Sequence, residues 1–198
     1  MPKHPVITLT TDFGDRGPFV GIMKGVIINI NHSAIIVDLC NHIEPHNIFE
    51  ASLFLSMSYE YFPKGSIHVA VVDPGVGSER RPILLSCGGH YFIGPDNGIF
   101  SHIYDKYKGN VNVIHITAKH YLLQSIGDTF HGRDVFAPVA GWLSKGIDTQ
   151  TFGNKIDDYL SFKINKPKKI KETIIKGEVS YIDTFGNAIT NLTKRHID

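Results

Sequence analysis

Short apolar runs alternate with segments of helical periodicity over the first three quarters of the chain, and this alternation constrains its fold most strongly. Strands are expected at 6–11, 34–40, 66–72, 83–87, 90–93 and 111–117, and helices at 18–30, 44–62, 98–107 and 133–143. Such alternation predicts a three-layer αβα domain with a mostly parallel sheet. The continuous apolar run 34–40 is typical of a strand covered on both faces. The glycines between 83–87 and 90–93 predict a hairpin turn.

The tail differs in composition from the rest of the chain. Residues 165–171 are basic and contain Pro167, which indicates a solvated linker. Short strands are expected at 174–182 and 188–192, but a segment of this size cannot bury a core by itself. The expected organisation is therefore an α/β domain over 1–162, followed over 163–198 by a linker and the start of a small β-rich domain.

The charge balance argues against a dedicated nucleic-acid or membrane-surface protein. Lys and Arg total 20 and Asp and Glu total 19, so no strong field would attract a polyanion. No apolar stretch reaches the roughly 20 residues of a membrane helix, and the polar start of the chain is unlike a signal peptide. Cys40 and Cys87 have no C-x-x-C partner, which excludes a zinc finger or a thioredoxin-type motif. These features predict a soluble cytoplasmic protein.

Two carboxylates stand at the expected carboxyl ends of strands, where α/β sheets bind their ligands. Asp12 follows the run 6–11, and Asp73 follows the run 66–72 and precedes a loop with two glycines. A carboxylate in such a position can accept two hydrogen bonds from a ribose diol. Arg80, beyond the glycine loop, would keep Asp73 ionised.

His131 is the best placed of the histidines, because it stands beside a glycine at an expected helix start. The outward-pointing N–H groups there disfavour the imidazolium and leave the ring as an acceptor. Asn187, in a turn between the last expected strands, could offer an amide to a ligand's carboxylate or ammonium. No G-x-G-x-x-G or G-K-[ST] loop occurs, which argues against Rossmann NAD enzymes and P-loop NTPases.

Six motifs in a fixed order are together far more specific than any one of them. They are T-D-F-G (11–14), D-L-C-N-H-I-E-P (38–45), D-P-G-V-G (73–77), G-P-D-N-G (94–98), F-H-G-R-D (130–134) and F-G-N (185–187). With this set, the chain closely resembles the S-adenosylmethionine hydroxide adenosyltransferase (S-adenosylmethionine hydrolase) family, which is related to the fluorinase and chlorinase enzymes. The resemblance runs from about residue 6 to the end.

The resemblance implies hydrolysis of S-adenosylmethionine to adenosine and L-methionine, by attack of water or hydroxide on ribose C5′ and without a metal or other cofactor. The residues that it assigns to catalysis are Asp73, Arg80 and His131, and those that it assigns to substrate binding are Asp12, His46, Phe185 and Asn187. Arg81 stays open as the alternative arginine, and so does the division of the base role between Asp73 and His131.

The resemblance also favours water over halide as the nucleophile. Halogenating relatives lack the Asp and His found here at 73 and 131, and the fluorinating branch carries an insertion near residues 83–93 that this chain lacks. Relatives continue past the F-G-N motif through a β-rich second domain, and they usually bind substrate between subunits of a trimer. We therefore expect a homotrimer and a shortened C-terminal domain. Gly17 stands where the family commonly carries an acidic residue.

Two other functions stay open on the sequence. The chain could be a non-catalytic S-adenosylmethionine- or adenosine-binding module that lost turnover with its C-terminal domain. It could also be a metal-dependent hydrolase built on Asp12, Asp73, His131 and Asp134, although no spaced ligand motif supports that reading.

Overall fold

The computed structural model describes residues 3–197, so Met1, Pro2 and Asp198 lie outside the description. The chain forms two compact units, residues 1–162 and 163–198. The strands of the first unit are β1 (Val6–Thr11), β2 (Ile35–Cys40), β3 (Ile67–Val71), β4 (Pro82–Cys87), β5 (His90–Pro95), β6 (Asn112–Ile116) and β7 (Gly153–Ile156). Its α-helices are α1 (Phe19–Ile30), α2 (Ile48–Ser58), α3 (Ser101–Tyr107) and α4 (Ala137–Ser144). Its shorter helical turns are η1 (Tyr59–Tyr61), η2 (Lys119–Tyr121), η3 (Gly132–Phe136) and η4 (Thr149–Phe152).

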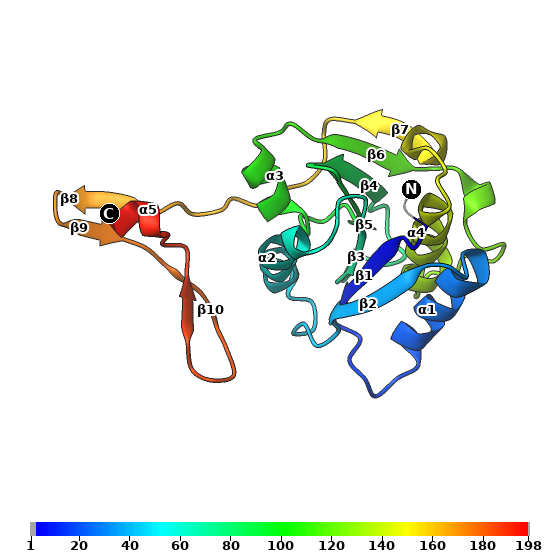
Figure 1. Ribbon diagram of the computed structural model, residues 1–198, viewed down its shortest axis with the longest axis horizontal. Helices are drawn as coiled ribbons and strands as arrows, with labels where there is room; N and C mark the ends of the chain where they lie inside the picture. The colour runs from blue at the N-terminus through cyan, green and yellow to red at the C-terminus, as the bar shows by residue number, and fades with distance from the viewer. Residues whose placement is uncertain (1–2, 198) are drawn as a thin grey trace. The chain divides into compact units, whose positions relative to one another are not determined.

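The seven strands of this unit form one sheet in the order β2-β1-β3-β5-β4-β6-β7 (Figure 1). β1 pairs in parallel with β2 and β3, and β5 pairs in parallel with β3. β4 is antiparallel to both β5 and β6, and β7 is antiparallel to β6. Only β4 and β7 of these seven strands therefore run against the common direction. The predicted α/β class with a mostly parallel sheet is confirmed.

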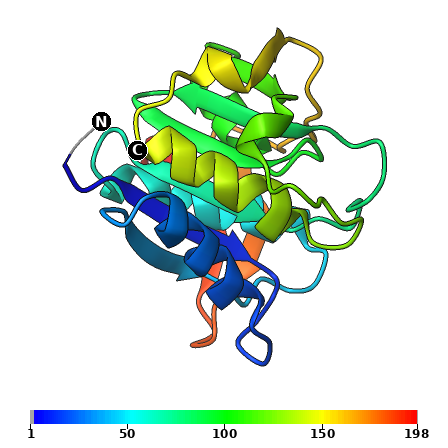
Figure 2. The same ribbon diagram turned by 90° about the vertical axis from the view of Figure 1, so that its right-hand side faces the viewer.

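Helices cover both faces of the sheet. α1 and α4 lie side by side on one face, and α2 and α3 lie on the other (Figures 1 and 2). Leu9 of β1 packs with Met23 and Leu143 in one buried cluster, whereas Ala70 of β3 packs with Leu55 in another. Full burial of one such aliphatic side chain is worth about 2 kcal/mol, so the two clusters hold the three layers together.

The expectation that residues 34–40 form a strand covered on both faces was wrong. β2 is an edge strand that pairs only with β1, and the Ile35 side chain is 48% exposed. An apolar run identifies a strand but not its position in the sheet. The helix expected from residue 44 starts only at Ile48, because Asn47 caps it by accepting the Glu50 N–H at 3.0 Å.

The second unit consists of two hairpins and a short helix. The strands are β8 (Lys168–Lys171), β9 (Ile174–Lys176), β10 (Val179–Ile182) and β11 (Ala188–Thr190), and α5 spans Lys194–Ile197. β8 pairs with β9 and β10 with β11, both antiparallel. The predicted linker was therefore wrong for 168–171. The single strand expected over 174–182 is broken at Gly177, where an added Cβ would lie 2.6 Å from Leu192 Cγ.

Among the described residues, no helix combines the length and the apolarity that a membrane crossing requires.

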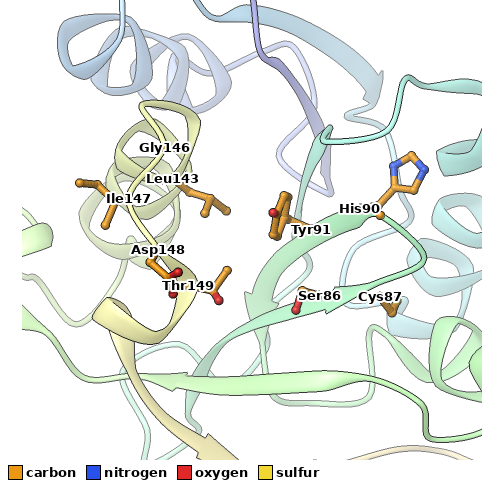
Figure 3. Close-up of a pocket in the computed structure, with 10 residues that line it drawn as sticks. Ser86, Cys87, His90, Tyr91, Leu143, Gly146, Ile147, Asp148 and Thr149 are labelled. Carbon is orange, nitrogen blue, oxygen red and sulfur yellow. The ribbon is translucent and has the colours of Figure 1, made fainter. Parts of the chain in front are cut away.

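Two buried histidines lie under the α2 side of the sheet. His68 of β3 is fully buried, with Thr8 Oγ1 2.8 Å from its Nδ1 and His90 Nδ1 3.3 Å from its Nε2. Figure 3 shows His90 and Tyr91 on opposite sides of β5. Burial, with a smaller contribution from His90, lowers the pKa of His68 to about 3. Burial also lowers the pKa of His90. Both rings are therefore neutral in the folded protein near pH 7.

The buried His68 makes the folded protein sensitive to acid. Below its ordinary pKa of 6.5 the unfolded chain takes up a proton there, while folded His68 stays neutral. Stability therefore falls as pH falls, and this ring contributes a loss of about 2 kcal/mol between pH 7.5 and pH 5. Urea unfolding at pH 7.5 and pH 5 should show that His68→Gln loses less unfolding free energy between these pH values than the wild-type protein. An identical loss in both proteins would contradict this assignment.

Candidate active site

The carboxyl ends of β1 and β3 lie next to each other, because the parallel register pairs Thr11 with Val71. Asp12 follows β1 directly and Asp73 follows β3 by two residues, so both carboxylates reach the same edge of the sheet. A cavity of about 140 Å³ opens there. Its lining comprises Asp12, Phe13, His46, Val71, Asp73, Val76, Thr129, Phe130, His131 and Gly132.

Arg80 returns to Asp73 through a tight loop. Val76 N–H donates to the Asp73 carbonyl at 3.2 Å, and Gly77 adopts φ +78°, a conformation that favours glycine. Arg80 Nε then donates to Asp73 Oδ1 at 2.9 Å, and Nη2 donates to Oδ2. The two side chains are only 8% and 5% exposed. Bidentate geometry in a dry environment fixes the guanidinium firmly.

His131 contacts the same guanidinium, and this contact decides which ring nitrogen carries the proton. Arg80 Nη2 lies 2.6 Å from His131 Nδ1. A guanidinium has donors only, so Nδ1 must accept and the neutral ring carries its proton on Nε2. Burial, followed by the positive charge of Arg80, lowers the pKa of His131 below 6.5. His131 is therefore a neutral ring whose Nε2–H is left to donate to a ligand.

Arg81 has different partners from Arg80. Its Nε and Nη2 donate to Asp96 Oδ2 at 3.0 and 2.7 Å, and its Nη1 donates to Asp158 Oδ1 at 2.8 Å. Of the two arginines that the sequence left open, the structure places Arg80 against Asp73 and His131.

Asp12 and His46 meet at the other side of the cavity. The His46 N–H donates to Asp12 Oδ2 at 3.0 Å, and His46 adopts φ +67°, which is uncommon for a residue other than glycine. The contact with Asp12 therefore comes from the backbone of His46, while the residue itself is exposed. Oδ1 of Asp12 accepts no hydrogen bond from the described residues, so it is the oxygen available to a diol.

Phe185 and Asn187 belong to the second unit, so their roles in substrate binding stay predictions. Phe185 is 89% exposed. The Asn187 amide Nδ2 donates to Asp183 Oδ2 at 2.8 Å, within their own turn.

Sequence reasoning assigned no role to the aromatic side chains beside the cavity. The rings of Phe13, Phe19 and Phe130 pack against one another, with centroids 5.3–6.0 Å apart. Phe13 and Phe130 stand inside two of the quoted motifs, and that position was a signal for them. Thr129 also lines the cavity but precedes its motif, and nothing in the sequence pointed to it.

A larger hollow of about 480 Å³ lies near the start of β5, at the amino edge of the parallel strands (Figure 3). It is lined by Ser86, Cys87, Gly89, His90, Tyr91, Leu143, Gly146, Ile147, Asp148 and Thr149. None of these residues belongs to the six motifs. The smaller cavity, which Asp73 and His131 line and behind which Arg80 joins them, is therefore the better candidate for chemistry.

Residues 3–197 contain no group of three or more His, Cys, Asp or Glu side chains arranged to hold a metal ion. Asp134, the fourth member of the metal site considered from the sequence, accepts instead from Gly127 N–H and from Arg133.

The contact between Arg80 and His131 can be tested by nuclear magnetic resonance of ¹⁵N-labelled histidine, with His131→Gln identifying the signal. We expect the Nε2–H form and a pKa below 6.5, because Arg80 occupies Nδ1 and repels a second positive charge. In Arg80→Gln the cation is gone while Asp73 remains, so the pKa of His131 should rise. An unchanged pKa in that variant would refute the contact.

Comparison with known proteins places the chain in a family. A family model described as the SAM hydroxide adenosyltransferase N-terminal domain matches residues 7–153. An (R)-S-adenosyl-L-methionine hydrolase from Methanocaldococcus jannaschii is 42% identical, over 97% of this chain and 68% of its own length. The crystal structure of an uncharacterized conserved protein from Thermotoga maritima is 36% identical, with a TM-score of 0.90 over 96% of this chain and 73% of that one.

A more distant similarity links the chain to halogenating enzymes. A fluorinase from Nocardia brasiliensis is 20% identical, over 99% of this chain and 74% of its own length. The family model covers most of the first unit, including Asp12, Asp73, Arg80 and His131. The chain belongs to the SAM hydroxide adenosyltransferase family.

Proposed function

We propose that this protein hydrolyses S-adenosylmethionine to adenosine and L-methionine, with water attacking ribose C5′. The observation that carries the proposal is that Asp73 and His131, both bound to Arg80, line one cavity together with Asp12. The M. jannaschii relative, which matches nearly the whole chain, is an (R)-S-adenosyl-L-methionine hydrolase, and this supports the substrate.

The reaction is a displacement that needs positioning more than strong acid–base chemistry. The water oxygen forms a bond to C5′ while the C5′–S bond breaks, and its electron pair stays on sulfur to give the neutral thioether of methionine. The water loses one proton to give the 5′-hydroxyl of adenosine. Holding the water in line with the leaving sulfur, and excluding other water, supplies much of the rate.

The hydrogen bonds within the site support a division of roles that the sequence left open. Because His131 Nδ1 accepts from Arg80, the ring offers Nε2–H to a lone pair of the water. Asp73 is then the acceptor for the departing proton, and Arg80 holds both partners in place. No step in this scheme calls for a metal.

Asp12 is proposed to bind the ribose diol, and the family resemblance supports substrate-binding roles for His46, Phe185 and Asn187. The family resemblance further supports a homotrimer, and the ordinary composition with only two cysteines supports a cytoplasmic location. The competing function is a module that binds the substrate or adenosine without turning it over.

Incubation of the purified protein with S-adenosylmethionine in H₂¹⁸O should yield methionine and adenosine that carries ¹⁸O at its 5′-hydroxyl, measured by mass spectrometry. Asp73→Asn removes the proton acceptor, so its rate should fall about 10²–10⁴-fold. Asp148 is an exposed carboxylate that caps η4, so Asp148→Asn is the control and should leave the rate unchanged. Adenosine binding without any product from the wild-type protein would favour the binding module.

Asp12→Ala should weaken nucleoside binding while leaving the chemical step largely intact. Loss of hydrogen bonds to a charged carboxylate corresponds to about 10–100-fold in affinity. Calorimetric titration with adenosine should show this weakening, and KM should rise by a similar factor at nearly constant kcat. A large fall in kcat with unchanged adenosine affinity would contradict the assignment.

A further inference from the structure

A fully buried carboxylate lies just beyond the cavity and takes no part in the proposed chemistry. Asp134 is 0% exposed and does not line the cavity. Its Oδ2 accepts the Gly127 N–H at 2.9 Å, and Arg133 donates to Oδ1 through Nε at 2.6 Å and to Oδ2 through Nη2 at 3.1 Å. A buried charge is costly unless it is paired and hydrogen-bonded, so these contacts stabilise the Asp134 carboxylate in its buried position.

The contacts of Asp134 close the loop 123–134 on itself. Its carbonyl accepts the Leu123 N–H at 3.0 Å, and its own N–H donates to the Phe130 carbonyl at 3.1 Å. These two bonds use the backbone of residue 134, and the side-chain carboxylate adds the tie to Gly127 in the middle of the loop. The part of the loop between the ties, residues 129–132, lines the cavity and includes His131.

The closed loop contacts the loop that carries Asp73 and Arg80. An added Cβ at Gly77 would lie 2.4 Å from the Asp128 carbonyl oxygen, so the two backbones touch at a place that admits no side chain. A further contact lies within the loop, where the Arg133 guanidinium lies 5.4 Å from the centroid of the Phe130 ring. A shift of loop 123–134 would therefore move His131 relative to Arg80.

We propose that Asp134 is a positioning residue that acts through His131: by closing the loop 123–134, it holds the imidazole against Arg80. The kinetic consequence of this inference rests on the proposed hydrolysis. The placement of His131 by Asp134 does not depend on that function. Asp134 contributes no atom to the nucleophile or the substrate. Its effect comes through the hydrogen bond between the guanidinium and His131 Nδ1, which a displacement of about 1 Å would break.

The kinetic test is a double-mutant cycle between Asp134 and His131. Asp134→Ala should lower kcat about 10²-fold, the cost of a misplacement of about 1 Å, and should leave adenosine affinity nearly unchanged because Asp12 is untouched. In the His131→Ala background the same change should cost little, because the group through which it acts is gone. Equal losses in both backgrounds, or a matching loss of adenosine affinity, would overturn the proposal.

A matched variant controls for general destabilisation. Asp96 is 3% exposed and paired with Arg81, outside the cavity. Asp96→Ala should lower the melting temperature, but its effect on kcat should be the same with and without His131. Asp134→Asn keeps an oxygen for the Gly127 N–H and should recover most of the rate lost in Asp134→Ala, to within about 10-fold of wild type. Failure of this amide to recover any activity would contradict the proposed mechanism of loop closure.

A measurement without turnover separates this inference from the proposed function. Histidine ¹⁵N spectra of Asp134→Ala, or of Asp134→Asn if the alanine variant does not fold, should show His131 losing its single Nε2–H form. Wild-type signals for His131 in either variant would overturn the inference whatever the enzymatic result. Altered signals in a protein whose wild type forms no adenosine would sustain the positioning role and reject the hydrolase.

Discussion

The buried contact of Arg80 with Asp73 and His131 is the interaction on which the candidate site depends. The guanidinium is only 8% exposed, so its charge must be paired, and the Asp73 carboxylate accepts two hydrogen bonds from it. The same nitrogen that binds Asp73 Oδ2 also reaches His131 Nδ1. One cation thereby fixes two side chains that come from distant parts of the chain, and it determines which ring nitrogen of His131 remains for a ligand.

The sheet makes this contact possible because it brings strand ends together. β1 and β3 are parallel neighbours with Thr11 opposite Val71, so Asp12 and Asp73 reach one edge. Loops that follow the strands can then supply the remaining groups without disturbing the core. The same edge receives the loop 123–134, whose backbone meets Gly77 at a distance that only glycine allows. The site therefore consists of loops held by a rigid scaffold and by their contacts with one another.

Much of the fold was predictable from the local pattern. The βα alternation, the hairpin between β4 and β5 and the buried run of β3 all follow from the positions of apolar residues and glycines. The edge position of β2, the antiparallel direction of β7 and which strand of the hairpin runs against the sheet were not predictable in this way, because they depend on which strands pair. The hairpin at 168–171 was missed for a related reason: its strand is exposed and rich in lysine, so no apolar alternation marks it.

The sequence by itself determined the fold class, the family and the motifs in which Asp12, Asp73 and His131 stand, because these follow from residue type and order along the chain. Only the tertiary structure showed that Arg80 contacts Asp73 while Arg81 contacts Asp96, since adjacent residues point in different directions and meet different carboxylates. It also decided the proton position on His131 and the closure of the loop by Asp134, because both depend on contacts between atoms whose spacing the linear chain does not specify.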